Sequence, residues 1–241
     1  MKVYLTWQDP ENRRWHTVGE LTYDQARYRF RYTKGATISP NFKPFGRLTA
    51  LDKTYFSDEL FALFENRILS KSRPEYNDYL RWMDINKSDG VNPLEILARS
   101  GGERATDGMQ IYPAPEKNAD NRYQSYFFVH GIRHLPKEVE ARINQLKEND
   151  RLYPMLDISN PYDRFAISLR TGDPAYMVGY CPRYLAKDAH NLTNHTSDLK
   201  ITVVKVNQDA PSQMRVLCQI DSEWPNNFSA CSDEECTPLS N

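Results

Sequence analysis

The chain has 241 residues, of which 39% are hydrophobic and 26% are charged, and its net charge is −1 at pH 7. This length suits one large domain or two of ordinary size, and no apolar run approaches the ~20 residues that span a bilayer. A near-neutral chain excludes a protein that coats long stretches of DNA through many phosphate contacts. We expect a cytoplasmic protein with no membrane partner, because Met1–Trp7 is too short for a signal peptide.

The first part of the chain reads as strands followed by helices. Apolar residues alternate with polar ones at Val3, Leu5 and Trp7 and again at Tyr28, Phe30 and Tyr32, which predicts antiparallel strands. Helical spacing then predicts helices over 60–68, behind Ser57 as N-cap candidate, and over 76–83. A short helix starts near Pro93 and stops at Gly101-Gly102, and 109–112 returns to strand. We therefore expect an α+β domain over residues 1–112.

The second part is dominated by short strands. Residues 113–122 are rich in proline and polar residues and predict a linker. Beyond it, strands are expected over 123–130, 151–158, 165–170, 177–180, 199–206 and 214–220, with helices over 139–146 and 184–191. This pattern favours a mainly-β small barrel with two helices over residues 123–222. Residues 223–241 carry four acidic and no basic residues, so we expect a flexible acidic tail.

Four motifs in the second part occur in a specific order. They are His130-Gly131-Ile132-Arg133-His134, then Leu156 to Asp163 ending in Asn160-Pro161-Tyr162-Asp163, then Phe165-Ala166-Ile167-Ser168-Leu169, then Val178-Gly179-Tyr180-Cys181-Pro182. Over about a hundred residues this order resembles the HIRAN domain, in which a glycine-aliphatic-arginine step precedes an N-P-Y-D turn, an A-I strand and a V-G-Y/H strand. The resemblance implies an OB-like small barrel.

The resemblance also implies a site. HIRAN domains are DNA-binding modules, and the version in helicase-like remodellers captures the 3' end of single-stranded DNA. Carried over, Arg133 would contact phosphate, Tyr162 would stack on the terminal base, and Asp163 would accept a hydrogen bond from the free 3'-hydroxyl. Asn160 would hold the turn or touch the sugar, and His134 stands where the remodellers have an aromatic residue. Base stacking on an aromatic ring tolerates any sequence, and only a chain end offers a hydroxyl proton.

Two other interpretations of these residues stay open. The N-P-x-D pattern is a common structural turn, in which Asp or Asn bonds nearby backbone. Asp157, Asp163 and His130 could instead hold Mg²⁺ in a nuclease site, although they include no third carboxylate at a useful spacing. We assign no catalytic residue on this basis.

The cysteines and the remaining histidines do not predict a metal site. Cys181, Cys218, Cys231 and Cys236 lack the two close pairs of a zinc site, so free thiols are expected. His190 and His195 are five residues apart, which places them off a common helical face. We expect no cofactor and no metal.

The first part resembles the N-terminal subdomain of HipA-type serine/threonine kinase toxins. The residues that carry this resemblance are Val18-Gly19-Glu20-Leu21, Tyr28 to Tyr32, the helix from Asp58 to Leu69, Arg73-Pro74-Glu75-Tyr76 and Gly101-Gly102. Neither a phosphate-binding loop nor a catalytic loop follows, so we expect no enzyme activity. The resemblance implies docking of a separately encoded HipA-like kinase core, a toxin–antitoxin-like role. The rival hypotheses are a DNA-end-processing nuclease and a DNA-binding accessory factor without a kinase partner.

Overall fold

The structure, a computed structural model, describes residues 1–240 apart from the side chain of Asp89. The chain divides into two compact units. The first comprises Met1–Leu80, Ile85–Ala114 and Cys231–Asn241, and the second comprises Arg81–Asp84 and Pro115–Ala230. One of the places where the chain passes from one unit to the other, between Ala114 and Pro115, lies inside the segment expected to be a linker.

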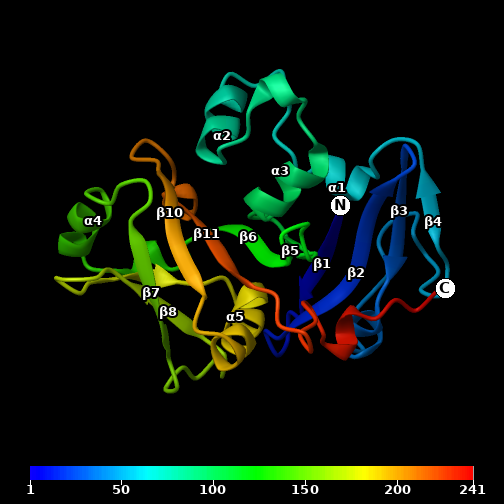
Figure 1. Cartoon of the computed structure of the whole chain (residues 1–241). Helices are drawn as coiled ribbons and strands as arrows, with labels where there is room; N and C mark the ends of the chain where they lie inside the picture. Colours follow the sequence, from blue (N-terminus) through cyan, green and yellow to red (C-terminus); the bar gives the residue numbers. More distant parts are fainter. Residues whose placement is uncertain (241) are drawn as a thin grey trace. The chain divides into compact units, whose positions relative to one another are not determined.

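The first unit is built on a five-stranded antiparallel sheet with the strand order β4-β3-β2-β1-β5 (Figure 1). Its strands are β1 (Lys2–Gln8), β2 (Trp15–Asp24), β3 (Arg27–Tyr32), β4 (Tyr55–Ser57) and β5 (Met109–Pro113). Val3, Leu5 and Phe30 are fully buried and form one core with residues of the helices. In β3 buried and more exposed residues alternate as the sequence predicts, whereas in β1 Tyr4 and Thr6 are buried as well, so both faces of that strand are covered.

Three α-helices accompany this sheet: α1 (Ala62–Glu65), α2 (Tyr76–Trp82) and α3 (Pro93–Ser100), with 3₁₀ turns η1 (Lys34–Thr37) and η2 (Lys87–Asp89). Helix α3 begins with Asn92, whose side chain accepts a bond from the Leu94 amide, and ends at Gly101 in the left-handed conformation. The helix expected over 60–68 is limited to one turn. Ser57 does not cap it, because Ser57 ends β4 and its hydroxyl accepts the Glu59 amide 3.2 Å away.

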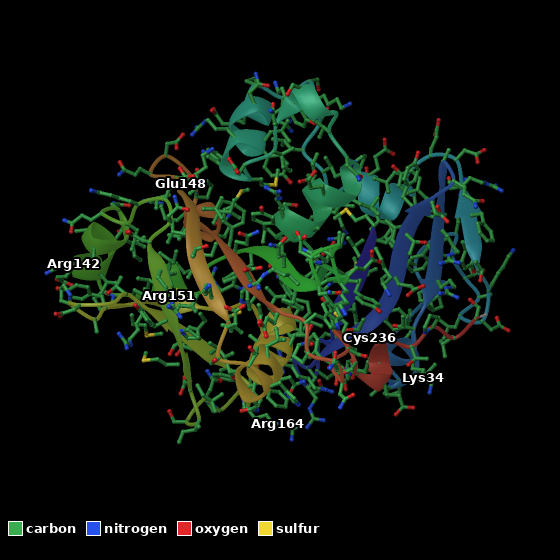
Figure 2. All side chains as sticks on the ribbon, in the orientation of Figure 1. Lys34, Arg142, Glu148, Arg151, Arg164 and Cys236 are labelled. Atoms are coloured by element: carbon green, nitrogen blue, oxygen red, sulfur yellow. The ribbon has the colours of Figure 1, made fainter. Side chains whose placement is uncertain are left out.

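The acidic C-terminal segment belongs to the first unit. It contains η5 (Glu234–Cys236), and Figure 2 labels Cys236 of this turn and Lys34 of the first unit. Glu235 accepts the Thr17 amide at 2.9 Å, and the Leu239 amide donates to the Tyr32 carbonyl at 2.9 Å. The flexible tail expected from composition is therefore not what the structure shows. Its carboxylates find specific donors, and Cys236 is buried.

The second unit is a six-stranded antiparallel half-barrel with the order β6-β11-β10-β7-β8-β9 (Figure 1). Its strands are β6 (Arg122–Phe128), β7 (Arg151–Leu156), β8 (Ile167–Arg170), β9 (Met177–Tyr180), β10 (Lys200–Val206) and β11 (Val216–Glu223). Its core includes the fully buried Tyr123, Phe127, Leu152 and Leu169. The helices are α4 (Lys137–Ile143) and α5 (Arg183–His195), with 3₁₀ turns η3 (Ile132–His134) and η4 (Ser212–Met214).

The two edges of this sheet meet at one pair of residues. Just after β6, His130 forms a β-bridge with Tyr180 of β9, with backbone N···O distances of 2.9 and 2.8 Å. The approach is close because Gly179, at φ 138°, has no side chain. A Cβ there would lie 2.4 Å from the His130 carbonyl oxygen and 2.5 Å from Val129 Cγ1. Gly179 therefore permits the closure of the barrel.

The expected fold class is confirmed: a mixed α/β sheet region comes first, and an antiparallel half-barrel with helices follows. Within residues 1–240, no helix combines the length and the apolar character needed to cross a membrane.

Candidate functional site

The N-P-Y-D motif forms a tight turn between β7 and β8, organised by Asn160. The side-chain oxygen of Asn160 accepts the amides of Tyr162 and Asp163 at 3.0 and 3.1 Å. Pro161 lies between them and has no amide to donate. Asparagine is suited to this role because its short side chain reaches the backbone two and three residues ahead. Asn160 thus holds the turn, one of the two roles expected for it.

Asp157 anchors the start of the turn. Its carboxylate accepts hydrogen bonds from the Ser159 hydroxyl at 2.9 Å and the Tyr180 hydroxyl at 3.0 Å, and the Asn160 amide group lies 3.4 Å away. These donors, Ser159 first, lower the pKa of Asp157, because they stabilise its charged form. Burial raises the pKa of Tyr180, and the neighbouring carboxylate adds to that shift. Asp157 is therefore an ionised structural acceptor.

Tyr162 and Asp163 are presented differently by this turn. The Tyr162 side chain is 85% exposed, so its ring face is open to solvent. Asp163 is largely buried: Oδ1 accepts the Phe165 amide at 2.9 Å, whereas Oδ2 lies 3.9 Å from Arg183 Nε. That distance is too long for a hydrogen bond. Oδ2 is thus a carboxylate oxygen, one residue after an exposed tyrosine in the chain, that has the capacity to accept a donor.

Arg183 comes to the turn from another element. It is the first residue of α5. Its Nη2 lies 3.4 Å from the Tyr162 carbonyl oxygen, and its Nε lies 3.9 Å from Asp163 Oδ2. The first turn of a helix carries unpaired amides and a partial positive charge. An exposed guanidinium beside these amides is a suitable place for a phosphate.

Arg133 and His134 lie on the segment that follows the barrel closure. Gly131 adopts the left-handed conformation at φ 81° and starts η3, from which both side chains are exposed. Arg133 Nε donates to His134 Nε2 at 3.0 Å. Within residues 1–240 neither side chain makes a direct hydrogen bond or ion pair with the 157–163 turn.

Tyr180 connects these two parts of the candidate site. Its backbone pairs with His130, its ring lies 3.5 Å from the position of a Cβ on Gly131, and its hydroxyl donates to Asp157. Tyr180 and Arg183 are site residues that sequence reasoning did not select. The V-G-Y motif was a signal for Tyr180, but the position of Arg183 depends on how α5 packs.

The residues of the nuclease alternative do not form a metal-ligand group. Asp157 and Asp163 are engaged in the turn, and His130 pairs through its backbone with Tyr180. Burial lowers the pKa of His130 to about 4, so its ring is neutral at pH 7. Among the described residues no three His, Cys, Asp or Glu side chains are grouped as metal ligands. None of the four cysteines forms a disulfide among the described residues, and His190 packs against Phe165, with ring centroids 5.4 Å apart.

Comparison with known proteins identifies the second unit. The family model of the HIRAN domain matches residues 123–224. A protein from Lactobacillus plantarum has a similar solved structure, at 18% identity and a TM-score of 0.33, covering 42% of this chain and 95% of that one. The HIRAN domain of human HLTF gives 16% identity and a TM-score of 0.32, covering 42% and 74%. No curated protein sequence matches the chain, and nothing assigns the first unit to a family. Residues 123–224 of this chain are a HIRAN domain.

Proposed function

We propose that this HIRAN domain binds single-stranded DNA by its free 3' end, without catalysing a reaction on it. The observation that carries the proposal is an exposed Tyr162 followed in the same turn by Asp163, whose Oδ2 has no hydrogen bond at 3.5 Å or less among the described residues. An aromatic face offers about 1–3 kcal/mol of stacking to any base. A carboxylate oxygen beside it selects the hydroxyl of a chain end.

Each site residue has a role in this capture. The terminal base stacks on Tyr162, and the 3'-hydroxyl donates to Asp163 Oδ2, which an internal phosphodiester cannot do because it has no hydroxyl proton. Arg183, beside the turn, and Arg133 bind phosphates of the strand. Asn160 and Asp157 keep the turn in shape before DNA arrives, which lowers the entropy cost of binding.

Oligonucleotides that differ by one hydroxyl test the proposal. A strand with a 3'-hydroxyl should bind at least about tenfold more tightly than the same strand ending in a 3'-dideoxynucleotide, because a hydrogen bond to a charged group contributes about 1.5–3 kcal/mol. Asp163→Ala should remove this difference. Glu148→Ala is the control, since Glu148 is an exposed acid in the same unit and lies outside the turn. Equal binding of both strands by the unmodified protein would refute hydroxyl capture.

A second variant separates stacking from folding. Tyr162→Ala should weaken binding of every single strand about tenfold and leave the unfolding temperature unchanged, because the side chain is 85% exposed. Tyr23→Ala is the matched control in the first unit, where the side chain is 40% exposed.

Two further parts of the proposal are tested separately: that the protein does not catalyse a reaction on DNA, and that a kinase core docks on it. Incubation of labelled single strands with the protein and Mg²⁺ should leave them intact, and degradation that Asp163→Ala abolishes would establish the nuclease instead.

Docking of a HipA-like kinase rests on the resemblance of the first part of the chain alone. Its test is co-purification of a co-expressed kinase core with residues 1–241, and recovery of nucleic acid only would favour an accessory factor.

A further inference from the structure

The outer face of the strands β7, β8 and β9 leads away from the 157–163 turn. In register, Tyr153 of β7 is opposite Arg170 of β8, and Met155 is opposite Ser168, which is opposite Tyr180 of β9. These residues lie on the face opposite to Leu152 and Leu169, which are fully buried in the core. Ser168 is itself buried, and the hydrogen bond from the Tyr180 hydroxyl to Asp157 connects these strands to the candidate site.

On this face, two arginines lie over the ring of one tyrosine. The guanidinium carbons of Arg151 and Arg170 lie 5.2 and 5.1 Å from the centroid of the Tyr153 ring. Tyr153 is 36% exposed and Met155 is 39% exposed, which is unusual for side chains in a strand of a small barrel. We call Arg151, Tyr153 and Arg170 the arginine–tyrosine face.

The two arginines are held differently. Arg170 also donates to the Thr171 carbonyl at 2.9 Å, so it is fixed at the end of β8. Arg151, labelled in Figure 2, begins β7, and it is exposed. Its guanidinium is able to leave the ring for a phosphate, and a base can then take its place on Tyr153. Arginine and tyrosine together bind the phosphate and the face of a base, the two features that every nucleotide of a single strand shares.

We infer that the arginine–tyrosine face is a second binding site for single-stranded DNA, which receives nucleotides upstream of the captured end. This inference rests on the proposed capture of a 3' end at Tyr162. Along β7, the four residues from Asp157 to Tyr153 span about 13 Å, which corresponds to about four nucleotides at a stacked spacing of roughly 3.4 Å. The occupant is a nucleic acid strand, since an apolar protein partner would not be matched by two guanidinium groups.

Affinity should therefore depend on oligonucleotide length. The probe is oligo-dT of two to eight nucleotides with a 3'-hydroxyl. Its affinity for the unmodified protein should increase by about tenfold or more between two and six nucleotides, which is the gain expected from stacking one further base. Tyr153→Ala should remove this increase and leave binding of the dinucleotide unchanged. Tyr153→Phe should restore it, because the ring is kept. Tyr23→Ala, in the first unit, serves as the matched control.

The salt dependence of binding reports on Arg151. For the hexanucleotide, Arg151→Gln should reduce the slope of log affinity against log salt by about 0.7, as expected for one lost phosphate contact on a single strand. For the dinucleotide the slope should not change. An unchanged slope for the hexanucleotide would contradict a phosphate contact at Arg151.

The two sites can fail independently. The second site is refuted if affinity does not depend on oligonucleotide length, or if that dependence persists in Tyr153→Ala. End capture stands in either case, provided that Tyr162→Ala still weakens binding of every oligonucleotide. If a 3'-dideoxy terminus has no effect while Tyr153→Ala still removes the length dependence, hydroxyl capture is refuted and the arginine–tyrosine face stands as a strand-binding surface.

Discussion

Replacing Gly179 with alanine should open the barrel at its closure. The added Cβ would lie 2.4 Å from the His130 carbonyl oxygen, which is backbone and cannot rotate away. The positive φ of 138° adds about 1–3 kcal/mol of strain for a residue with a side chain. Separation of the two edges breaks the paired bonds of 2.9 and 2.8 Å between His130 and Tyr180, each worth about 1 kcal/mol. The sum is about 3–5 kcal/mol.

Thermal unfolding followed by circular dichroism measures this cost. A loss of 3 kcal/mol lowers the unfolding temperature of a domain of about 100 residues by roughly 12 °C or more, and hydrogen exchange should accelerate in peptides from β9. Gly131→Ala is the control in the same unit: its φ is 81°, but the nearest atom, Tyr180 Cδ2, is at an ordinary 3.5 Å. It should cost only about 1–2 kcal/mol. Equal unfolding temperatures for the two variants would refute the role assigned to the close approach.

Three further predictions concern pH, the C-terminal segment and the turn. Burial lowers the pKa of His130 to about 4, against about 6.5 in the unfolded chain, so the stability that the neutral ring contributes is present above pH 6.5 and is lost as the pH falls toward 4. The free energy of unfolding measured with urea should therefore fall by about 2 kcal/mol between pH 7 and pH 5. His130→Gln should remove much of that pH dependence. Glu235→Ala should destabilise the first unit by about 1–3 kcal/mol, because it deprives the Thr17 amide of its acceptor. The control is Glu234→Ala, which breaks an exposed ion pair with Lys34 and should leave the unfolding midpoint unchanged. Tyr180→Phe should weaken binding of a 3' end roughly fivefold by loosening the turn, and unchanged affinity would show that its hydroxyl is dispensable.

Local signals in the sequence identified the turn and most of the elements. Asn160 bonds the amides of residues only two and three positions ahead, so its role depends on neighbours that the sequence itself displays. Helix α3 is similar, since Asn92 and Gly101 mark its two ends. Helix α1 shows the limit of such signals. Ser57 has the chemistry of a cap, but pairing of β4 with β3 places it in a strand.

The C-terminal segment was misjudged for a related reason. Its acidic composition is typical of disorder, because like charges repel and few apolar residues are available to bury. In the structure Glu235 accepts from Thr17, more than two hundred residues away in the chain. Composition describes a segment alone and does not show which donors the fold brings to it.

The sequence by itself determined the order of the HIRAN motifs, the class of each unit and the residues of the turn, because these depend on short-range spacing and on the alternation of buried and exposed positions. Only the tertiary structure decided that Tyr180 joins the Gly131 step to the turn, that Arg183 faces Asp163, and that two arginines lie over the Tyr153 ring. Those contacts come from strand register, barrel closure and helix packing, which bring together residues that are distant in the chain.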